Sequence, residues 1–527
     1  MLSLTFPNLG RALILMSLAL LLGCGPSEPT VDIISQSPET LAQDLAAGEL
    51  SAVEVTGAFL ARIEALDRRG PSLHAVLELN DAALDDAAAL DEILARSGPV
   101  GPLHGLPVLI KGNIDVAGLV NSAGSLALAD NRIDKDAPLV AAARRAGAVI
   151  LGTANLSEWA NFRDANSSSG WSSLGGQTKN PHVLDRNPCG SSSGSAVAVA
   201  AGLVPLAVGT ETNGSIVCPA GTNGVVGIKP TVGLVSRTGV IPISHSQDTA
   251  GPIARTVTGA ALLLQALAGH DPADSLSKDV GALSLTPDPA ATDLAGRRIG
   301  ILRTYRGAGR RPRVEAIYQD AVDRLQVLGA ELIDPIEYES TPAMRGASYR
   351  ILLREFKAGL NAYLAGRGLP AMASLEDLIE FDQTHADRVM PIFGQSIFVE
   401  AATASGLDDP EHAGDVELAQ AGLRADLMRL FSEHRLDALF IPVNGPAWKT
   451  DWTNGDYSNF GGTAYLAAVT GYPSIVLPAG RVDHLPIAVG FVGRPDSEAD
   501  LIQMAYALEQ SLPPLPEPEF LPTLETL

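Results

Sequence analysis

Residues 190–215 read GSSSGSAVAVAAGLVPLAVGTETNGS, and the order of polar and apolar segments in this stretch indicates the fold class. The segment 196–201 is apolar on every side, which is typical of a buried, helix-like segment. Residues 206–209 form a short apolar run typical of a buried strand. The helix-like segment follows a turn rich in glycine and serine, and the strand precedes the turn 210–215, which contains threonine, asparagine, glycine and serine. This succession is typical of an α/β protein.

The rest of the chain repeats the alternation of helices and strands. Ser51 and Glu54 form a capping box at the start of a helix, with apolar residues at helical spacing behind it. Residues 273–296 carry prolines and polar residues and are interpreted as a connector. We expect helices at 37–50, 51–67, 81–96, 137–147, 314–328, through most of 352–432, and at 498–511. We expect strands at 106–110, 148–151, 206–209, 298–302, 437–441 and 474–477.

Composition excludes several classes of protein. The chain has 527 residues, of which 46% are apolar and 18% charged, so a large core can form and general disorder is excluded. The 52 glycines and 36 prolines exclude a coiled coil or a helical repeat. A formal net charge of −23 repels nucleic acid, so no nucleic-acid partner is expected.

The N-terminus resembles the signal of a bacterial lipoprotein. Residues 12–22 form an apolar run after Arg11 that is too short to span a bilayer, and it ends at Leu22-Gly23-Cys24. The resemblance implies a signal peptide at 1–23, lipidation of Cys24, a tether at 24–36 and a membrane lipid anchor. We therefore expect an exported lipoprotein of the bacterial cell envelope, at the outer membrane or the periplasmic face.

The two other cysteines are Cys189 and Cys218. A disulfide would suit an exported protein, but spacing alone does not show whether the two residues approach each other. Two free, buried thiols are the expectation. Neither has zinc-ligand spacing to a pair of histidines, so no metal or cofactor site is expected.

Candidate chemistry lies at three places. Lys111 ends an apolar strand, where poor hydration lowers a lysine pKa and makes the amine a possible base; taken alone, such a lysine more often reaches solvent. The turn 212–215, after the strand at 206–209, could point successive backbone N–H groups at an oxyanion, with Gly214 giving the backbone freedom.

The third place is the turn 190–194. It matches G-x-S-x-G with Ser192 central, the pattern of an α/β-hydrolase nucleophile. The residues before it, 185–189, form a turn instead of the strand that such an elbow needs. His434 and His484 are the candidate histidines for that alternative.

Together the three places resemble the amidase signature family. The most specific stretches are 185–196, 209–216 and 227–237, and 471–478 resembles the last core region of that family. The sequence at 191–195, 215–219 and 241–252 is most similar to that of the peptide amidases, which remove the C-terminal carboxamide of peptides. The resemblance implies a central mixed β-sheet covered by helices on both faces, in one amidase domain at 37–515 followed by a Pro-rich tail at 516–527.

The resemblance also implies roles for individual residues. Ser215 is the implied nucleophile, Ser191 the bridging serine after a cis peptide bond, and Lys111 the base. The N–H groups of Thr212, Asn213, Gly214 and Ser215 are the implied oxyanion hole. The substrate is a small-molecule or peptide amide, and no cofactor is implied. Cys189 and Ser193 stand where the family more often has glycine, and Gly112 stands where it often has Asp, which bears on substrate preference.

Some residues are expected to have a structural role only, and some alternative functions are less favoured. Arg237 and Asp248 are expected to form a structural pair beneath the site. Core or rim packing is expected for four aromatic residues, Trp159, Phe162, Trp171 and Tyr457. The alternatives are an esterase that uses Ser192, and a non-enzymatic solute-binding lipoprotein. A subunit of a tRNA-dependent amidotransferase belongs to the same family. The export signal and the negative charge argue against a role with that partner.

Overall fold

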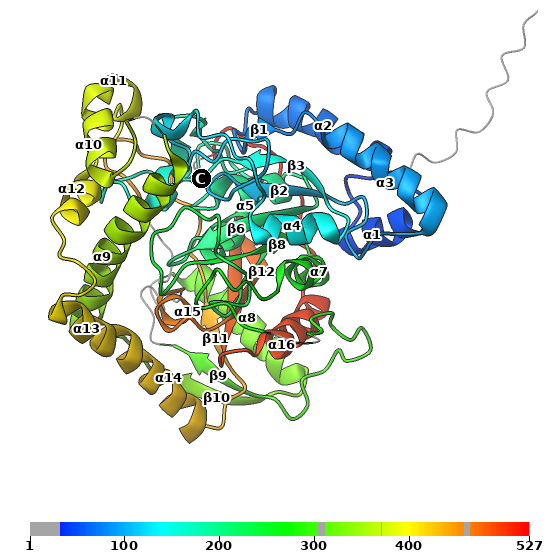
Figure 1. The fold of residues 1–527 in the computed structure, drawn as a ribbon. Helices are drawn as coiled ribbons and strands as arrows, with labels where there is room; N and C mark the ends of the chain where they lie inside the picture. The colour runs from blue at the N-terminus through cyan, green and yellow to red at the C-terminus, as the bar shows by residue number, and fades with distance from the viewer. Residues whose placement is uncertain are drawn as a thin grey trace, which may run out of the picture.

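The fold is built on one mixed β-sheet of eleven strands. The computed structural model describes residues 32–279, 281, 283–303, 311–369, 371–457 and 464–525. The strand order is β1-β3-β2-β6-β8-β7-β12-β13-β11-β9-β10, and a separate pair, β4 and β5, lies outside it. In Figure 1 the sheet runs from β1, beside α2, to β10 at the opposite end. The α/β class with a central mixed sheet is therefore confirmed.

The strands divide into parallel and antiparallel neighbours. β2 is parallel to β3 and β6, and β9 is parallel to β10 and β11, whereas the pairs from β6 through β13 to β11 are antiparallel. The strands are β1 (Val76–Leu79), β2 (Pro107–Lys111), β3 (Val149–Ala154), β4 (Trp171–Ser172), β5 (Gly176–Gln177), β6 (Leu206–Glu211), β7 (Val226–Lys229), β8 (Thr249–Ala254), β9 (Arg298–Leu302), β10 (Glu331–Ile336), β11 (Ala438–Pro442), β12 (Ser474–Val482) and β13 (Leu485–Gly493).

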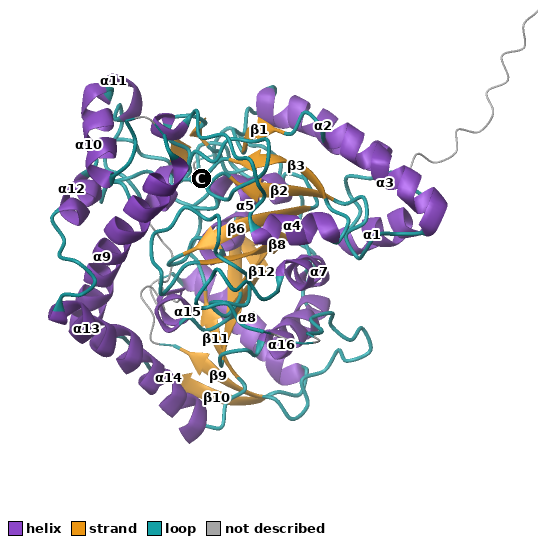
Figure 2. Cartoon of the chain, viewed as in Figure 1, coloured by secondary structure: helices purple, strands orange, loops and turns teal. Residues whose placement is uncertain are grey.

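Helices flank both faces of the sheet, and a group of them extends to one side of it. Figure 2 shows α9 to α14 as an arc beside the strands. The helices are α1 (Pro38–Ala47), α2 (Ala52–Ile63), α3 (Ala83–Ser97), α4 (Pro138–Arg145), α5 (Ser193–Ala200), α6 (Val217–Asn223), α7 (Val257–Leu267), α8 (Pro312–Val327), α9 (Pro342–Arg367), α10 (Leu375–Thr384), α11 (Ala386–Val389), α12 (Ser396–Ala402), α13 (Pro410–Val416), α14 (Gly422–Glu433), α15 (Ala464–Thr470) and α16 (Glu498–Ser511). No helix of the described residues is long and apolar enough to cross a membrane.

Local sequence explains most of these boundaries. The capping box at Ser51 and Glu54 is present, and the expected strand at 298–302 and helix at 498–511 have the observed bounds. The expected connector at 273–296 contains no helix or strand among its described residues. The sequence did not predict β8, because its TAGPIA run contains glycine and proline, which are rare in central strands. Pro252 lies opposite Val208 of β6, and β7 pairs with β8 only at 253 and 254.

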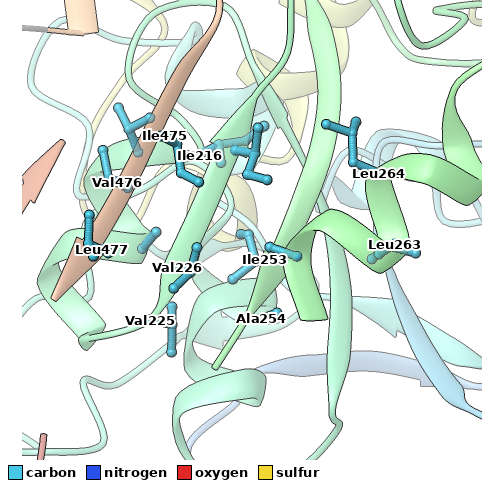
Figure 3. Packing of buried hydrophobic residues seen from close by; sticks show 14 of the residues in the cluster. Ile216, Val225, Val226, Ile253, Ala254, Leu263, Leu264, Ile475, Val476 and Leu477 are labelled. Atoms are coloured by element: carbon cyan, nitrogen blue, oxygen red, sulfur yellow. The ribbon is translucent and has the colours of Figure 1, made fainter. Parts of the chain in front are cut away.

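The core continues directly beneath the turn that follows β6. Figure 3 shows Ile216 among buried side chains of β7, β8 and β12, including Val226, Ile253 and Ile475. Ile216 is fully buried, and it is the residue after Ser215. A polar turn is thereby anchored to the rigid centre of the sheet.

Replacement of Gly194 by alanine should destabilise the protein by about 3 kcal/mol, because α5 contacts the end of β3 through backbone atoms at this residue. A Cβ on Gly194 would lie 2.3 Å from the carbonyl oxygen of Ala75 and 2.4 Å from that of Asn155. The matched control is Gly57→Ala, inside α2, where a Cβ meets nothing within 4 Å. The control should stabilise by about 0.5–1 kcal/mol. Equal midpoints of urea unfolding for the two variants would contradict this account.

Candidate active site

Lys111 lies at the carboxyl end of β2, between β3 and β6, and its side chain is fully buried. Its Nζ donates to Thr210 Oγ1 at 2.9 Å and to the Thr210 carbonyl oxygen at 3.2 Å. The third neighbour is Ser191 Oγ, at 2.7 Å. Since Thr210 accepts two N–H groups, a neutral Lys111 would direct its lone pair at the Ser191 hydroxyl.

Burial dominates the electrostatics of this lysine. It lowers the pKa of Lys111 well below the ordinary value of 10.5, because the charged form is deprived of water. The negative charges of Glu211 and Asp248 raise that pKa, but their effect is the smaller one. The neutral amine is therefore accessible at lower pH than in an exposed lysine.

Ser191 lies in a tightly held turn before α5. The peptide bond between Gly190 and Ser191 is cis, as the family resemblance implies. Ser191 is fully buried, and its carbonyl oxygen accepts a hydrogen bond from the Ser157 N–H at 3.1 Å. Before it, Cys189 has a φ of +58°, and its carbonyl oxygen accepts the Ser193 hydroxyl at 2.6 Å. Hydrogen bonds at Ser191 itself and at the residues on either side of it hold this turn beside Lys111.

Ser215 lies in the turn between β6 and α6. Gly214 has a φ of +87°, which bears out the expected backbone freedom. The Glu211 carboxylate accepts the N–H groups of Ile216 at 2.7 Å and Val217 at 3.0 Å, and this closes the turn. Among the described residues, the N–H groups of Asn213, Gly214 and Ser215 donate no hydrogen bond, and the Ser215 hydroxyl has no partner. These donors and this hydroxyl remain available to a ligand.

A second carboxylate supports the same turn from the side. Asp248 accepts the Thr212 hydroxyl at 2.5 Å and the N–H groups of Ile243 and Ser244 at 2.8 and 2.9 Å. Burial raises the pKa of Asp248 to about 6, although these hydrogen bonds favour its ionised form. Gln247 completes the support by donating to the Thr212 carbonyl oxygen at 3.1 Å.

A cavity of about 310 Å³ opens beside the two turns. Gly190, Asn213 and Gly214 line it together with the apolar side chains of Ile397 and Trp448. Asp164 and Asp456 also line it, and no lysine, arginine or histidine of the described chain does. A larger cavity, of about 790 Å³, lies at a different place, between α1, α7 and the C-terminal segment 512–518, and includes none of the candidate residues.

Two predictions about the surroundings of the site are wrong. Cys189 and Cys218 form a disulfide and are not free thiols; their Cα atoms are 6.0 Å apart because the turns before α5 and after β6 meet. Arg237 does not pair with Asp248 but forms an ion pair with Asp274, on the segment that follows α7. Both errors arise because the partners belong to separate turns of the chain.

Ser192 is not placed as a nucleophile. Its hydroxyl is fully buried, donates to the Thr210 carbonyl oxygen at 3.0 Å and accepts the Thr210 N–H at 3.2 Å. The candidate histidines of that alternative have other places: His484 contacts Glu519 at 3.0 Å, and His434 ends α14. The geometry therefore does not support the esterase alternative.

The sequence analysis missed Thr210, Asn113 and Glu211. Asn113 donates to Thr210 Oγ1 at 3.1 Å, so Thr210 Oγ1 accepts hydrogen bonds from Lys111 at the end of β2 and from Asn113 just after it. Their position at the ends of β2 and β6 could have indicated them. Side chains at the carboxyl ends of adjacent parallel strands lie at one edge of the sheet.

The aromatic residues behave mostly as expected. Trp159, Phe162 and Trp171 are buried and pack edge-on against Phe398, Phe356 and Phe393, whereas Tyr457 is exposed. Arg163 is fully buried, pairs with Glu158 at 2.5 Å and donates to the Val389 carbonyl oxygen at 2.8 Å. It thereby joins the polar segment beside the site to the helical arc.

Comparisons with known proteins identify amidases as relatives of this chain. The family model described as Amidase matches residues 54–502. A probable amidase of Arabidopsis thaliana is 37% identical over 464 residues, which are 85% of this chain and 85% of that protein. A putative amidase of Arthroderma benhamiae is 33% identical over 494 residues, which are 88% of this chain and 79% of that protein.

Solved structures agree with the fold. The native peptide amidase of Stenotrophomonas maltophilia superposes with a TM-score of 0.84 at 46% identity, covering 92% of this chain and 99% of that one. The peptide amidase PAM in complex with the competitive inhibitor chymostatin has a TM-score of 0.86 at the same identity and coverage.

Replacement of Lys111 by methionine should stabilise the protein at pH 6 and by less at pH 9. The folded protein disfavours the lysine proton and the unfolded chain keeps it, so the free energy of unfolding of the wild type rises with pH towards 10.5. Each unit of pKa lowering is worth about 1.4 kcal/mol, and the variant lacks this slope. Thr210 keeps Asn113 and Ser192 as partners. The buried Ser191 hydroxyl loses Lys111 as a partner, but this cost is the same at both pH values, so the difference between them reports the lysine proton. Urea unfolding at both pH values measures the difference, and parallel pH profiles would refute the prediction.

Proposed function

Because the chain belongs to the amidase family and is an amide-hydrolysing enzyme, we propose that it removes the C-terminal carboxamide of peptides through a relay of Lys111, Ser191 and Ser215. The observation that carries the relay is the contact of 2.7 Å between the fully buried Lys111 Nζ and Ser191 Oγ. The similarity to peptide amidases at 46% identity supports the choice of substrate.

The proposed reaction begins with proton transfer. Neutral Lys111 accepts the Ser191 proton, and Ser191 accepts the Ser215 proton as Ser215 Oγ attacks the amide carbon. The N–H groups of Asn213, Gly214 and Ser215, with that of Thr212 at the start of the turn, stabilise the oxyanion. Asn213 to Ser215 suit this role because these groups have no acceptor among the described residues.

The leaving group explains why a relay is needed. Ammonia leaves an amide only after the nitrogen is protonated, so the proton taken from Ser215 returns through Ser191 to the departing nitrogen. The products of this half-reaction are ammonia and an acyl ester on Ser215. Water then attacks the ester with the same base, and the free peptide acid leaves. The cavity of about 310 Å³ beside Gly190 and Gly214 offers space for the acyl part.

The test uses serine variants and a peptide amide. Ser215→Ala, Ser191→Ala and Lys111→Ala should each reduce ammonia release by roughly a thousandfold or more, with non-additive effects because the three act as a unit. Ser215→Ala should also lose labelling by a fluorophosphonate, whereas Ser191→Ala keeps slow labelling. The control Ser192→Thr retains a hydroxyl at the neighbouring position and should remain labelled. Wild-type turnover by Ser215→Ala would overturn the relay.

We also propose that Cys24 carries the lipid anchor of an exported enzyme. Residues 1–31 lie outside the described residues, so the support is the apolar run at 12–22 before Cys24, together with a disulfide of the kind found in oxidising compartments. Cys24→Ser should release the protein from the membrane fraction or block its processing. Mass spectrometry and fractionation measure both, and equal mass and equal solubility of wild type and variant would refute the anchor.

A further inference from the structure

The disulfide joins the turn that carries Ser191 to the start of α6, directly after the turn that carries Ser215. Cys189 lies two residues before Ser191, and Cys218 lies three residues after Ser215. The bond between them spans 29 positions and closes a covalent ring that contains α5 and β6. The separation of the two turns is therefore constrained by the chain itself as well as by packing.

Each end of the disulfide is fixed to its own turn. The Cys189 N–H donates to Asn187 Oδ1 at 2.8 Å, and the Cys189 carbonyl oxygen accepts the Ser193 hydroxyl. On the other side, the Cys218 N–H donates to the Gly214 carbonyl oxygen at 2.8 Å. A displacement of either turn is thus transmitted through the sulfur atoms to the other.

Other direct ties between the two turns are few among the described residues. The Ser192 N–H donates to the Ser215 carbonyl oxygen at 3.1 Å. Within the described part of the chain, no hydrogen bond holds the Ser215 hydroxyl towards Ser191. The Ser192 hydroxyl also exchanges two hydrogen bonds with Thr210, and Asn223 Nδ2 donates to the Pro188 carbonyl oxygen at 2.8 Å. These hydrogen bonds hold the backbone near the two serines, and none of them fixes the Ser215 hydroxyl.

The disulfide also borders the cavity beside the site. Cys189 and Cys218 line that cavity with Gly190, Asn213 and Gly214, and they pack against Trp448 in a small cluster apart from the main core. The bond therefore lies at the reaction centre, and its contacts with the core are limited.

We propose that the Cys189–Cys218 disulfide is a positioning element that holds Ser215 at proton-transfer distance from Ser191, so that amide hydrolysis requires the oxidised enzyme. This inference rests on the relay proposed above. Two-electron reduction by a dithiol breaks the S–S bond and yields two protein thiols, while the dithiol leaves as its own disulfide. Both cysteines become free to separate, and the turns are then held by noncovalent contacts alone.

The expected defect is selective for substrates that need the relay. An amide requires return of the proton to a poor leaving group, whereas a p-nitrophenyl ester has a good leaving group and requires it less. Loss of the disulfide should thus lower kcat for a peptide amide at least tenfold and kcat for the ester less than threefold, with KM for the amide changed less than threefold. General loss of structure would lower both activities by the same factor.

The experiment compares the wild type before and after reduction with dithiothreitol, and after reoxidation, with the double variant Cys189→Gly, Cys218→Ala. Glycine is chosen at 189 because the residue has a φ of +58°, which glycine adopts without strain. Cys24→Ser keeps the disulfide and is the matched control. Reduced wild type and double variant should show the selective amide defect, and reoxidation should restore the wild type alone.

Two results would overturn the positioning role. Full amide activity of the reduced wild type, with both thiols titrated, overturns the positioning role. Equal losses of amide and ester activity overturn it as well and assign the disulfide to stability. If the double variant does not fold, the reduction and reoxidation of the wild type decide. Ser215→Ala is measured in parallel, because amide turnover by that variant would refute the relay itself and not only the role of the disulfide.

Discussion

The candidate active site is built around one lysine amine that is buried away from water. Lys111 ends a strand that pairs on both sides within the sheet, and its side chain is fully buried. This burial disfavours the protonated form, and Thr210 satisfies two N–H groups so that the amine is not left without partners. A surface lysine would keep its proton and would offer no base to Ser191.

Hydrogen bonds hold the polar turns around this amine in place, although the N–H groups of 213–215 and the Ser215 hydroxyl have no partner among the described residues. Ser192 binds Thr210 through its hydroxyl and Ser215 through its N–H, so the residue between the proposed relay partners is a structural link. Glu211 and Asp248 perform the corresponding task for the turn 212–217. Buried polar groups are costly when they lack partners, which explains why the stretch rich in serine and asparagine coexists with an apolar core beneath Ile216.

Sequence reasoning succeeded where the information is local. The capping box at Ser51, the strand at 298–302 and the helix at 498–511 follow from residue patterns of less than about fifteen positions, and they are observed. It failed for β8, where glycine and proline contradict the usual strand composition, and for Arg237, whose carboxylate partner is Asp274 instead of Asp248. In both cases neighbouring segments, and not the local residues, decide the outcome.

The sequence by itself determined the α/β class and the identity of the polar turns, because the spacing of apolar residues and of glycine and serine is a local property. It also placed Lys111 at the end of a strand. Only the tertiary structure decided that Lys111 meets Ser191 across 80 positions, that Thr210 accepts from both Lys111 and Asn113, and that Cys189 is bonded to Cys218. The physical reason is that these contacts arise where the carboxyl ends of β2 and β6 meet the turns before α5 and α6, and that edge exists only once the strands have paired.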